Sequence, residues 1–154
     1  MKKRNILLVV LGFIVLFTLT GCGNKTVKAT SDFKSIAESK GYTVSDVTSQ
    51  YSSYPDVTEA TVAQSSSGYQ LEFYVLDEIE NAKNMFETNR ETFDQNKGSN
   101  YSHSEVNLGN YSTYSLTNDG YYMYLSRVEN TLLYVRVPKS YKDDIKGFVK
   151  ELGY

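Results

Sequence analysis

The N-terminal 21 residues constrain the fold most, because their pattern separates them from any folded domain. A cationic head, Met1-Lys2-Lys3-Arg4, precedes an apolar run over residues 6–19. A charged head, an apolar middle and small residues before a processing point are typical of a secretory signal peptide. As a helix, this run would be roughly 21 Å long, shorter than the ~30 Å hydrocarbon core of a bilayer. The sequence therefore predicts residues 1–21 as a cleaved signal peptide rather than a permanent membrane span.

The only cysteine, Cys22, directly follows Leu19-Thr20-Gly21. This tetrapeptide resembles the lipobox of bacterial lipoproteins, which implies cleavage before Cys22 and a diacylglyceryl group on its sulfur. Two acyl chains hold a protein stably on a bilayer, whereas one chain binds only marginally. The resemblance implies a lipid anchor in the cell membrane, at the outer face of the cytoplasmic membrane. The alternative is an uncleaved anchor helix with an incidental cysteine. In overall plan, with its Lys-, Asn- and Tyr-rich style, the chain also resembles small lipoproteins of Gram-positive bacteria.

Loss of the signal peptide leaves an acidic chain. Without Lys2, Lys3 and Arg4, 13 Lys and Arg remain against 18 Asp and Glu, a net charge of −5. Binding to a nucleic-acid backbone needs a clustered basic face, so we expect no nucleic-acid partner. Because Cys22 is predicted to be acylated, no disulfide is available, and the fold depends on burial and hydrogen bonds. The remaining length fits one domain.

The mature chain divides into a short tether and one domain. Residues 22–30 are polar and without periodicity, which predicts a lipidated, solvated tether, and residues 31–154 are predicted as a single α+β domain. Hydrophobic periodicity and turn residues predict helices at about 31–40, 77–95 and 140–152. They also predict strands at 57–64, 69–76, 101–107, 112–116, 120–128 and 131–137, with a further extended segment at 42–47. This order predicts an antiparallel sheet of about five to six strands with the helices packed on one face.

The alternation within the strands suggests a candidate binding surface. The chain has 14 tyrosines and no tryptophan. If the helices cover one face of the sheet, one parity of the strands places several polar and aromatic side chains on the other face. These candidate binding residues are Tyr74, Tyr122, Tyr124, Tyr134 and Arg136. Tyrosine supplies a rigid contact area with a polar tip, as recognition surfaces use. The alternative is structural, because tyrosine also stabilises half-exposed sheets through cross-strand pairs.

The sequence gives only weak evidence for a catalytic site or a metal site. His103 is the only histidine, and its serine neighbours do not resemble a nucleophile elbow. The acidic pairs Asp77-Glu78 and Asp143-Asp144 fall in first helical turns, where they complement the helix dipole, so we expect no metal site. No phosphate-binding glycine loop is present, and no cofactor is expected.

Two classes of function remain open. The first is a non-catalytic binding or accessory module of the cell envelope, with membrane lipid as its anchor through Cys22 and an envelope protein, peptide or glycan as its partner. The second is a small envelope hydrolase that uses His103. The predicted open, tyrosine-rich face of the sheet favours the binding module.

Overall fold

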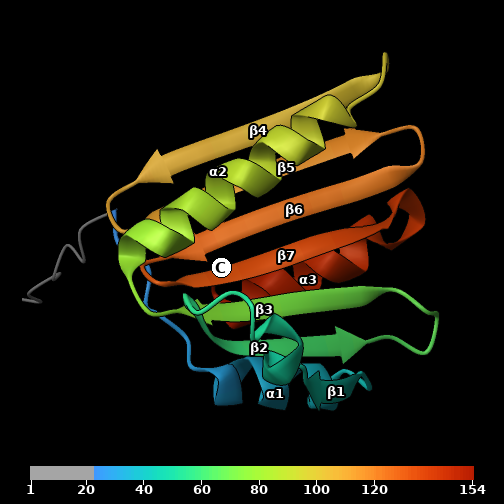
Figure 1. Ribbon diagram of the computed structural model, residues 1–154. Helices are drawn as coiled ribbons and strands as arrows, with labels where there is room; N and C mark the ends of the chain where they lie inside the picture. Colours follow the sequence, from blue (N-terminus) through green and yellow to red (C-terminus); the bar gives the residue numbers. More distant parts are fainter. Residues whose placement is uncertain (1–22) are drawn as a thin grey trace, which may run out of the picture.

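The computed structural model describes residues 23–154, in which seven strands form one antiparallel sheet (Figure 1). The order of the strands across the sheet is β1-β2-β3-β7-β6-β5-β4. Their bounds are β1 Thr43–Asp46, β2 Val57–Gln64, β3 Gln70–Leu76, β4 Tyr101–Leu108, β5 Tyr111–Asn118, β6 Tyr121–Val128 and β7 Thr131–Pro138. The C-terminal meander therefore places its last strand, β7, beside β3 of the N-terminal hairpin.

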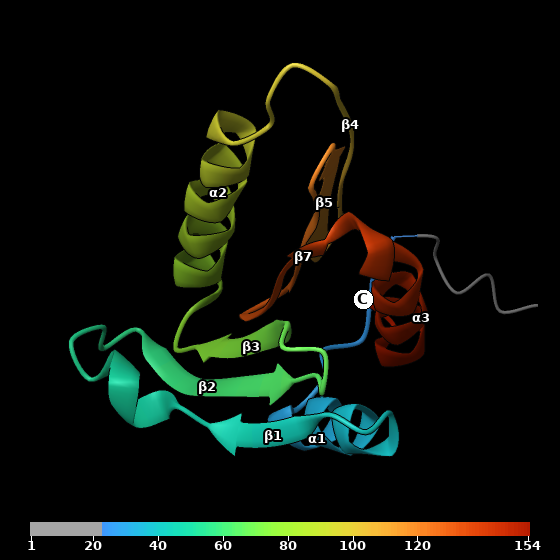
Figure 2. The same cartoon turned by 90° about the vertical axis from the view of Figure 1, so that its right-hand side faces the viewer.

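Three α-helices cover the two faces of this sheet. Their bounds are α1 Thr30–Ser39, α2 Ile79–Gln95 and α3 Lys142–Leu152, and two 3-10 turns are η1 Thr48–Tyr51 and η2 Lys139–Tyr141. Helix α2 lies on one face, whereas α1 and α3 lie on the other (Figure 2). The strong twist of the sheet turns β1, β2 and β3 away from the plane of the remaining strands in the same view.

Local sequence explains where the elements begin and end. Helix α3 ends at Gly153, which adopts a left-handed conformation with φ of 81°. Such a conformation favours glycine, since other residues suffer a clash between Cβ and the backbone. The turn between β6 and β7 is only two residues long and places Glu129 at a φ of 50°. Positive φ is what a tight two-residue hairpin turn requires.

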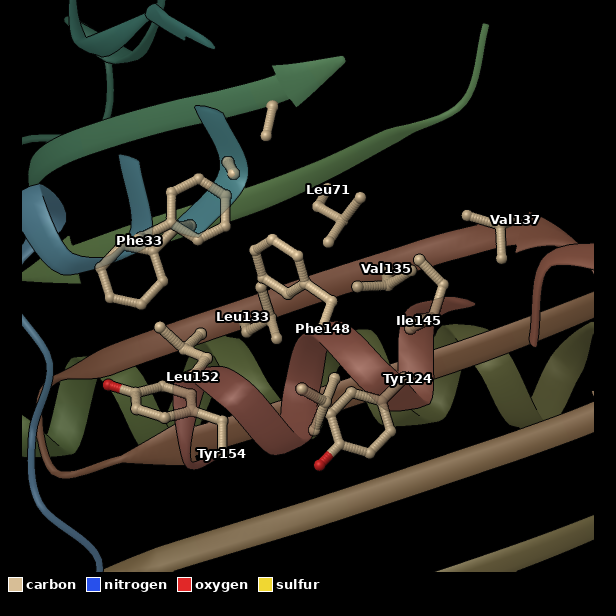
Figure 3. Close-up of a cluster of buried hydrophobic side chains, with 14 of the residues drawn as sticks. Phe33, Leu71, Tyr124, Leu133, Val135, Val137, Ile145, Phe148, Leu152 and Tyr154 are labelled. Atoms are coloured by element: carbon tan, nitrogen blue, oxygen red, sulfur yellow. The ribbon is translucent and has the colours of Figure 1, made fainter. Parts of the chain in front are cut away.

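Each face of the sheet has its own hydrophobic core. Phe33 of α1 and Phe148 of α3 meet at 5.7 Å between ring centroids, and Phe33 stacks on Phe73 of β3 at 5.1 Å (Figure 3). On the opposite face, Phe86 and Phe93 of α2 pack into a second cluster. The two cores share the sheet as their common wall.

The α+β class and the antiparallel sheet agree with the sequence, but two finer expectations were wrong. The described residues form seven strands rather than five to six, because the extended segment after α1 pairs with β2 as β1. The helices cover both faces rather than one. An amphipathic pattern shows which side of a helix is buried, but it does not show which face of the sheet that helix meets.

The predicted signal peptide and Cys22 lie outside the described residues. The segment at 23–29 contacts the domain through backbone hydrogen bonds to Asn110 and Tyr154, so it differs from the solvated tether that we expected. In the part of the chain that the structure describes, no helix combines the length and the hydropathy needed to cross a bilayer.

Candidate functional site

The five candidate binding residues do not form one surface. Residues paired directly across a sheet share a face, and β6 pairs Tyr124 with Val135 and Leu125 with Tyr134. Tyr122 and Tyr124 therefore face α3, whereas Tyr74, Tyr134 and Arg136 face α2. The side chains of Tyr74, Tyr122 and Tyr124 are only 4%, 3% and 9% exposed. The expectation of an open tyrosine face was wrong, because helices cover both sides of the sheet.

Two of these tyrosines nevertheless line the wall of a groove beside α3. The groove has a volume of about 520 Å³ and lies between the C-terminal part of α3 and strands β4, β5 and β6. We call this hollow the α3 groove. Its lining residues are Ser104, Thr113, Ser115, Tyr122, Tyr124, Lys146, Val149, Lys150 and Tyr154. A volume of this size is within the usual range for ligand sites.

Hydroxyl groups line the sheet side of the α3 groove. Ser104 of β4 pairs with Ser115 of β5, and Thr113 lies on the same face two residues away. Each hydroxyl can donate one hydrogen bond and accept others. Because α3 does not extend over β4 and β5, these hydroxyls remain beside the groove rather than beneath a helix (Figure 2).

Lysines line the helix side of the same groove. Lys142, Lys146 and Lys150 recur at a spacing of four residues, which places them along one side of α3. Lys146 and Lys150 line the groove itself. The ammonium Nζ of Lys142 donates to Thr117 Oγ1 at 3.0 Å, and it lies 5.4 Å from the ring centroid of Tyr122. Within residues 23–154, the salt bridges involve none of these three lysines.

Asp144 and Glu151 lie on a different side of α3 from Lys142 and Lys146, whereas Asp143 lies three residues before Lys146. Glu151 pairs with Lys40 at 2.6 Å between Oε2 and Nζ. Asp143 and Asp144 line a different hollow, beside Lys40 and Gly41 at the end of α1. This separation leaves a local cationic edge on a chain whose mature form is predicted to be acidic. Such an edge attracts anions, although the attraction between exposed charges falls with added salt.

The two tyrosines of the groove are held in place by packing. The rings of Tyr122 and Tyr124 stack with 6.4 Å between centroids. Figure 3 shows Tyr124 at the margin of the core beside α3, with its hydroxyl directed away from Phe148. Burial raises the pKa of Tyr124 to about 12, and it also raises the pKa of Tyr122. Both phenols are therefore neutral at physiological pH and can act as hydrogen-bonding groups.

The other candidate residues have different surroundings. Tyr74 donates a hydrogen bond to Glu72, and its hydroxyl lies 2.7 Å from that of Tyr51. Burial, followed by the negative charge of Glu72, raises the pKa of Tyr74. Tyr134 is half-buried against Phe93 of α2, with 5.3 Å between their centroids. The structure therefore gives Tyr74 and Tyr134 packing roles.

Arg136 is the exposed member of the set. Its guanidinium carbon lies 4.1 Å from the ring centroid of Tyr121, a cation–π contact on the α2 side of the sheet. It is thus separated by the sheet from the lysines of the α3 groove.

A second hollow, of about 430 Å³, lies between α2 and the segment that joins η1 to β2. Tyr51 and Tyr54 lie on one side of it, and the amides of Asn81, Asn84 and Asn89 on the other. Among residues 23–154, no lysine or arginine lines it. The approach of α2 to this segment depends on tertiary structure, so local sequence patterns do not indicate the hollow.

His103 lies on the α2 side of the sheet, outside the α3 groove. It lies exposed on the edge strand β4, between the rings of Tyr101 and Tyr114 at 5.9 and 6.1 Å. Among the described residues, it makes no hydrogen bond to a serine or a carboxylate, although a nucleophile–base pair needs such contact. Within the same range, no three His, Cys, Asp or Glu side chains gather as a metal site.

Of the five candidate binding residues, only Tyr122 and Tyr124 line the α3 groove, and its lysines were not among the candidates. Lysines every four residues along the last helix were the available signal. They were not distinguished from an ordinary solvated face because only the structure shows that the β4–β5 hydroxyls lie opposite.

Comparisons with known proteins do not identify a family. No protein-family model matches the sequence, and a search of curated proteins finds no match. Among solved structures, the chain is similar to a GTP binding regulator from Thermotoga maritima, with 20% sequence identity and a TM-score of 0.44. The match covers 82% of this chain and 85% of the other. A likeness at this level carries no argument about function.

Proposed function

We propose that this protein is a lipid-anchored extracytoplasmic lipoprotein whose domain is a non-catalytic binding module for an anionic glycan of the cell envelope. The anchor rests on the lipobox resemblance at Leu19-Thr20-Gly21-Cys22. The binding role rests on one observation, the convergence of α3 lysines and β4–β5 hydroxyls around the α3 groove. The partner bears phosphate or carboxylate groups together with hydroxyls.

The chemistry of the groove supports this class of ligand over a neutral one. Lys146 and Lys150 offer ammonium groups to an anion, and a charge-assisted hydrogen bond contributes more than a neutral one. Ser104, Ser115 and Thr113 offer donors and acceptors that match sugar or polyol hydroxyls. A repeating polymer with both kinds of group would contact the two sides of the groove at once.

Binding is tested with the acylated protein in detergent micelles, by calorimetry with a glycerol-phosphate oligomer. Lys146→Gln and Lys150→Gln are each expected to weaken binding by roughly tenfold or more, because each removes a hydrogen bond from a charged group. Lys83→Gln on α2 is the matched control, since Lys83 is an exposed lysine on the other face of the sheet. Equal effects of all three substitutions, or equally tight binding of neutral N-acetylglucosamine oligomers, would contradict the proposed ligand.

The anchor is tested separately in cells. Cys22→Ala is expected to prevent incorporation of labelled lipid and to move the protein out of the membrane-anchored pool. Cys22→Ser serves as a second variant, since it retains a small polar side chain but lacks the sulfur that the acyl group requires. Lipid labelling that persists in either variant would refute acylation at this residue.

A further inference from the structure

The segment before α1, residues 23–29, is hydrogen-bonded to the domain through Lys25 and Lys28. Lys25 donates its backbone N–H to Asn110 Oδ1 at 2.9 Å, and Asn110 Nδ2 donates back to the Lys25 carbonyl at 2.8 Å. The Lys25 ammonium lies 4.8 Å from the ring centroid of Tyr111. Lys28 donates its backbone N–H to the Tyr154 hydroxyl at 3.2 Å. In Figure 3 that hydroxyl points toward the segment, drawn in blue.

Apolar packing and a close backbone approach add to these bonds. Val27 packs against the core beneath α1 and α3. A Cβ atom on Gly109 would lie 2.2 Å from the Gly23 carbonyl oxygen and 2.3 Å from Asn24 Oδ1. The turn between β4 and β5 therefore accommodates the segment only because residue 109 is glycine. We call residues 23–29 the docked segment.

The docked segment determines where the chain leaves the domain. The Asn110 carbonyl accepts from the backbone of Glu129, and the Asn130 side chain donates to the carbonyl of Leu76. The β4–β5 turn, the β6–β7 turn and the end of β3 thus form one end of the sheet. The start of α2 follows directly after β3 at the same end (Figure 1). Cys22 directly precedes Gly23 in the sequence.

We infer that the docked segment holds this end of the sheet against the bilayer surface, so that the domain has one preferred orientation on the membrane. The inference rests on the proposed acylation of Cys22. A free tether of seven residues would reach up to ~25 Å and allow the domain to turn. A docked segment removes that reach, because its backbone is bonded to the sheet.

The surface at this end fits the interfacial region of a lipid bilayer. Leu108 and Ile79 are 49% and 46% exposed there. Exposed apolar side chains of this kind can enter the boundary between headgroups and acyl chains. Asp77, Glu78 and Glu129 lie at the same end as Lys25, so the charges there are of both signs, with carboxylates in the majority. A zwitterionic membrane therefore tests the acyl anchor and the apolar contacts without a contribution from anionic lipid.

Strand β4 provides a matched pair of positions for the test, since Leu108 and Tyr101 are its two ends and are 49% and 43% exposed. Leu108→Cys and Tyr101→Cys are made separately in the acylated protein, in which Cys22 is blocked and a thiol-reactive fluorophore labels only the new cysteine. The proteins are placed in phosphatidylcholine vesicles containing a headgroup-nitroxide lipid. Quenching is expected to be stronger at position 108 than at 101. Equal quenching, or stronger quenching at 101, would overturn the inference.

Release of the docked segment should make quenching at positions 108 and 101 equal and should also expose the Lys28 amide to solvent. Lys25→Pro deletes the donor to Asn110 without changing the sheet, and Asn110→Ala deletes the partner. Hydrogen exchange of the Lys28 amide is expected to become about tenfold faster in both, as expected for the loss of one to two hydrogen bonds. Asn118→Ala is the control, because Asn118 bonds the backbone of the turn at the opposite end of β5. Unchanged exchange in both test variants would overturn the inference.

Acylation is measured on the same samples by intact mass and by flotation with vesicles. A protein that is acylated and floats, but shows equal quenching at the two positions, retains the proposed anchor and loses the proposed orientation. A protein without the acyl mass loses both, because no anchor then holds the docked segment at the bilayer.

Discussion

At Gly109 the docked segment leaves no room for a Cβ atom. Gly109→Ala places a Cβ 2.2 Å from the Gly23 carbonyl oxygen, so the segment must move. Gly68→Ala is the matched control, because Gly68 also has a positive φ and its Cβ would meet nothing within 4 Å. Each substitution carries a left-handed backbone cost of about 1–2 kcal/mol. Gly109→Ala alone is expected to accelerate hydrogen exchange at Lys28, and equal exchange in the two variants would contradict the close approach.

Tyr154 links the docked segment to the sheet through its hydroxyl. That hydroxyl accepts from the Lys28 backbone and also bonds Thr131 Oγ1 of β7, at a site where the side chain is 5% exposed. Tyr154→Phe keeps the ring, removes the bond to Thr131 and leaves the Lys28 N–H without its partner, so the free energy of unfolding should fall by about 1–2 kcal/mol. Urea unfolding measures this loss. Tyr141→Phe, at a half-buried tyrosine packed on Tyr69, should change stability by less, and a reversed order would contradict this account.

Helix α2 provides an entire core on its own face of the sheet. Phe93 is 1% exposed and packs on Tyr134, so Phe93→Ala is expected to lower the free energy of unfolding by about 3–5 kcal/mol. Ile79→Ala, at a residue 46% exposed in the first turn of the same helix, should cost far less. Chemical denaturation of the two variants measures the difference. Similar small losses would mean that α2 does not form a core with the sheet.

The elements show which parts of the fold were predictable. The periods of α2 and α3 and the turn residues of the hairpins are local, so their bounds agree with the sequence to within a few residues. Local sequence does not determine which core a residue of a strand faces. In β6, seven of eight residues are buried, so Tyr122 and Met123 face opposite cores and the alternation contains no polar side. The aromatic part of the α3 groove was therefore predicted with the wrong partners, and its lysines were not recognised.

At the scale of the whole molecule, the two cores account for much of the tyrosine content. Tyr74 and Tyr114 belong to the core under α2, whereas Tyr122, Tyr124 and Tyr154 belong to the core under α1 and α3. Several of these hydroxyls have specific partners, such as Asp94 Oδ1, 2.6 Å from Tyr114. A tyrosine-rich composition therefore stabilises a disulfide-free domain in which apolar rings fill both cores and their hydroxyls reach polar groups at the margins.

This distribution of tyrosines predicts an alkaline transition. Burial raises the pKa of Tyr124 from 10.0 to about 12, and burial also raises the pKa of Tyr122 and Tyr154. The native state therefore keeps these phenolic protons at a pH where the unfolded chain has lost them. Their contribution to stability is fully present below pH 10 and is lost as pH rises through the native pKa, by up to about 1.4 kcal/mol per pH unit for each group.

Absorbance of tyrosinate near 295 nm and circular dichroism, followed together from pH 8 to 13, test this prediction. Exposed tyrosines should ionise first with the fold intact, and the buried set should ionise with the loss of secondary structure. Tyr124→Phe removes one linked proton, so the decline of the free energy of unfolding between pH 10 and 12 should be shallower in this variant. Ionisation of all tyrosines in one step near pH 10, with an unchanged circular dichroism spectrum, would show that the two cores do not exclude water from these rings.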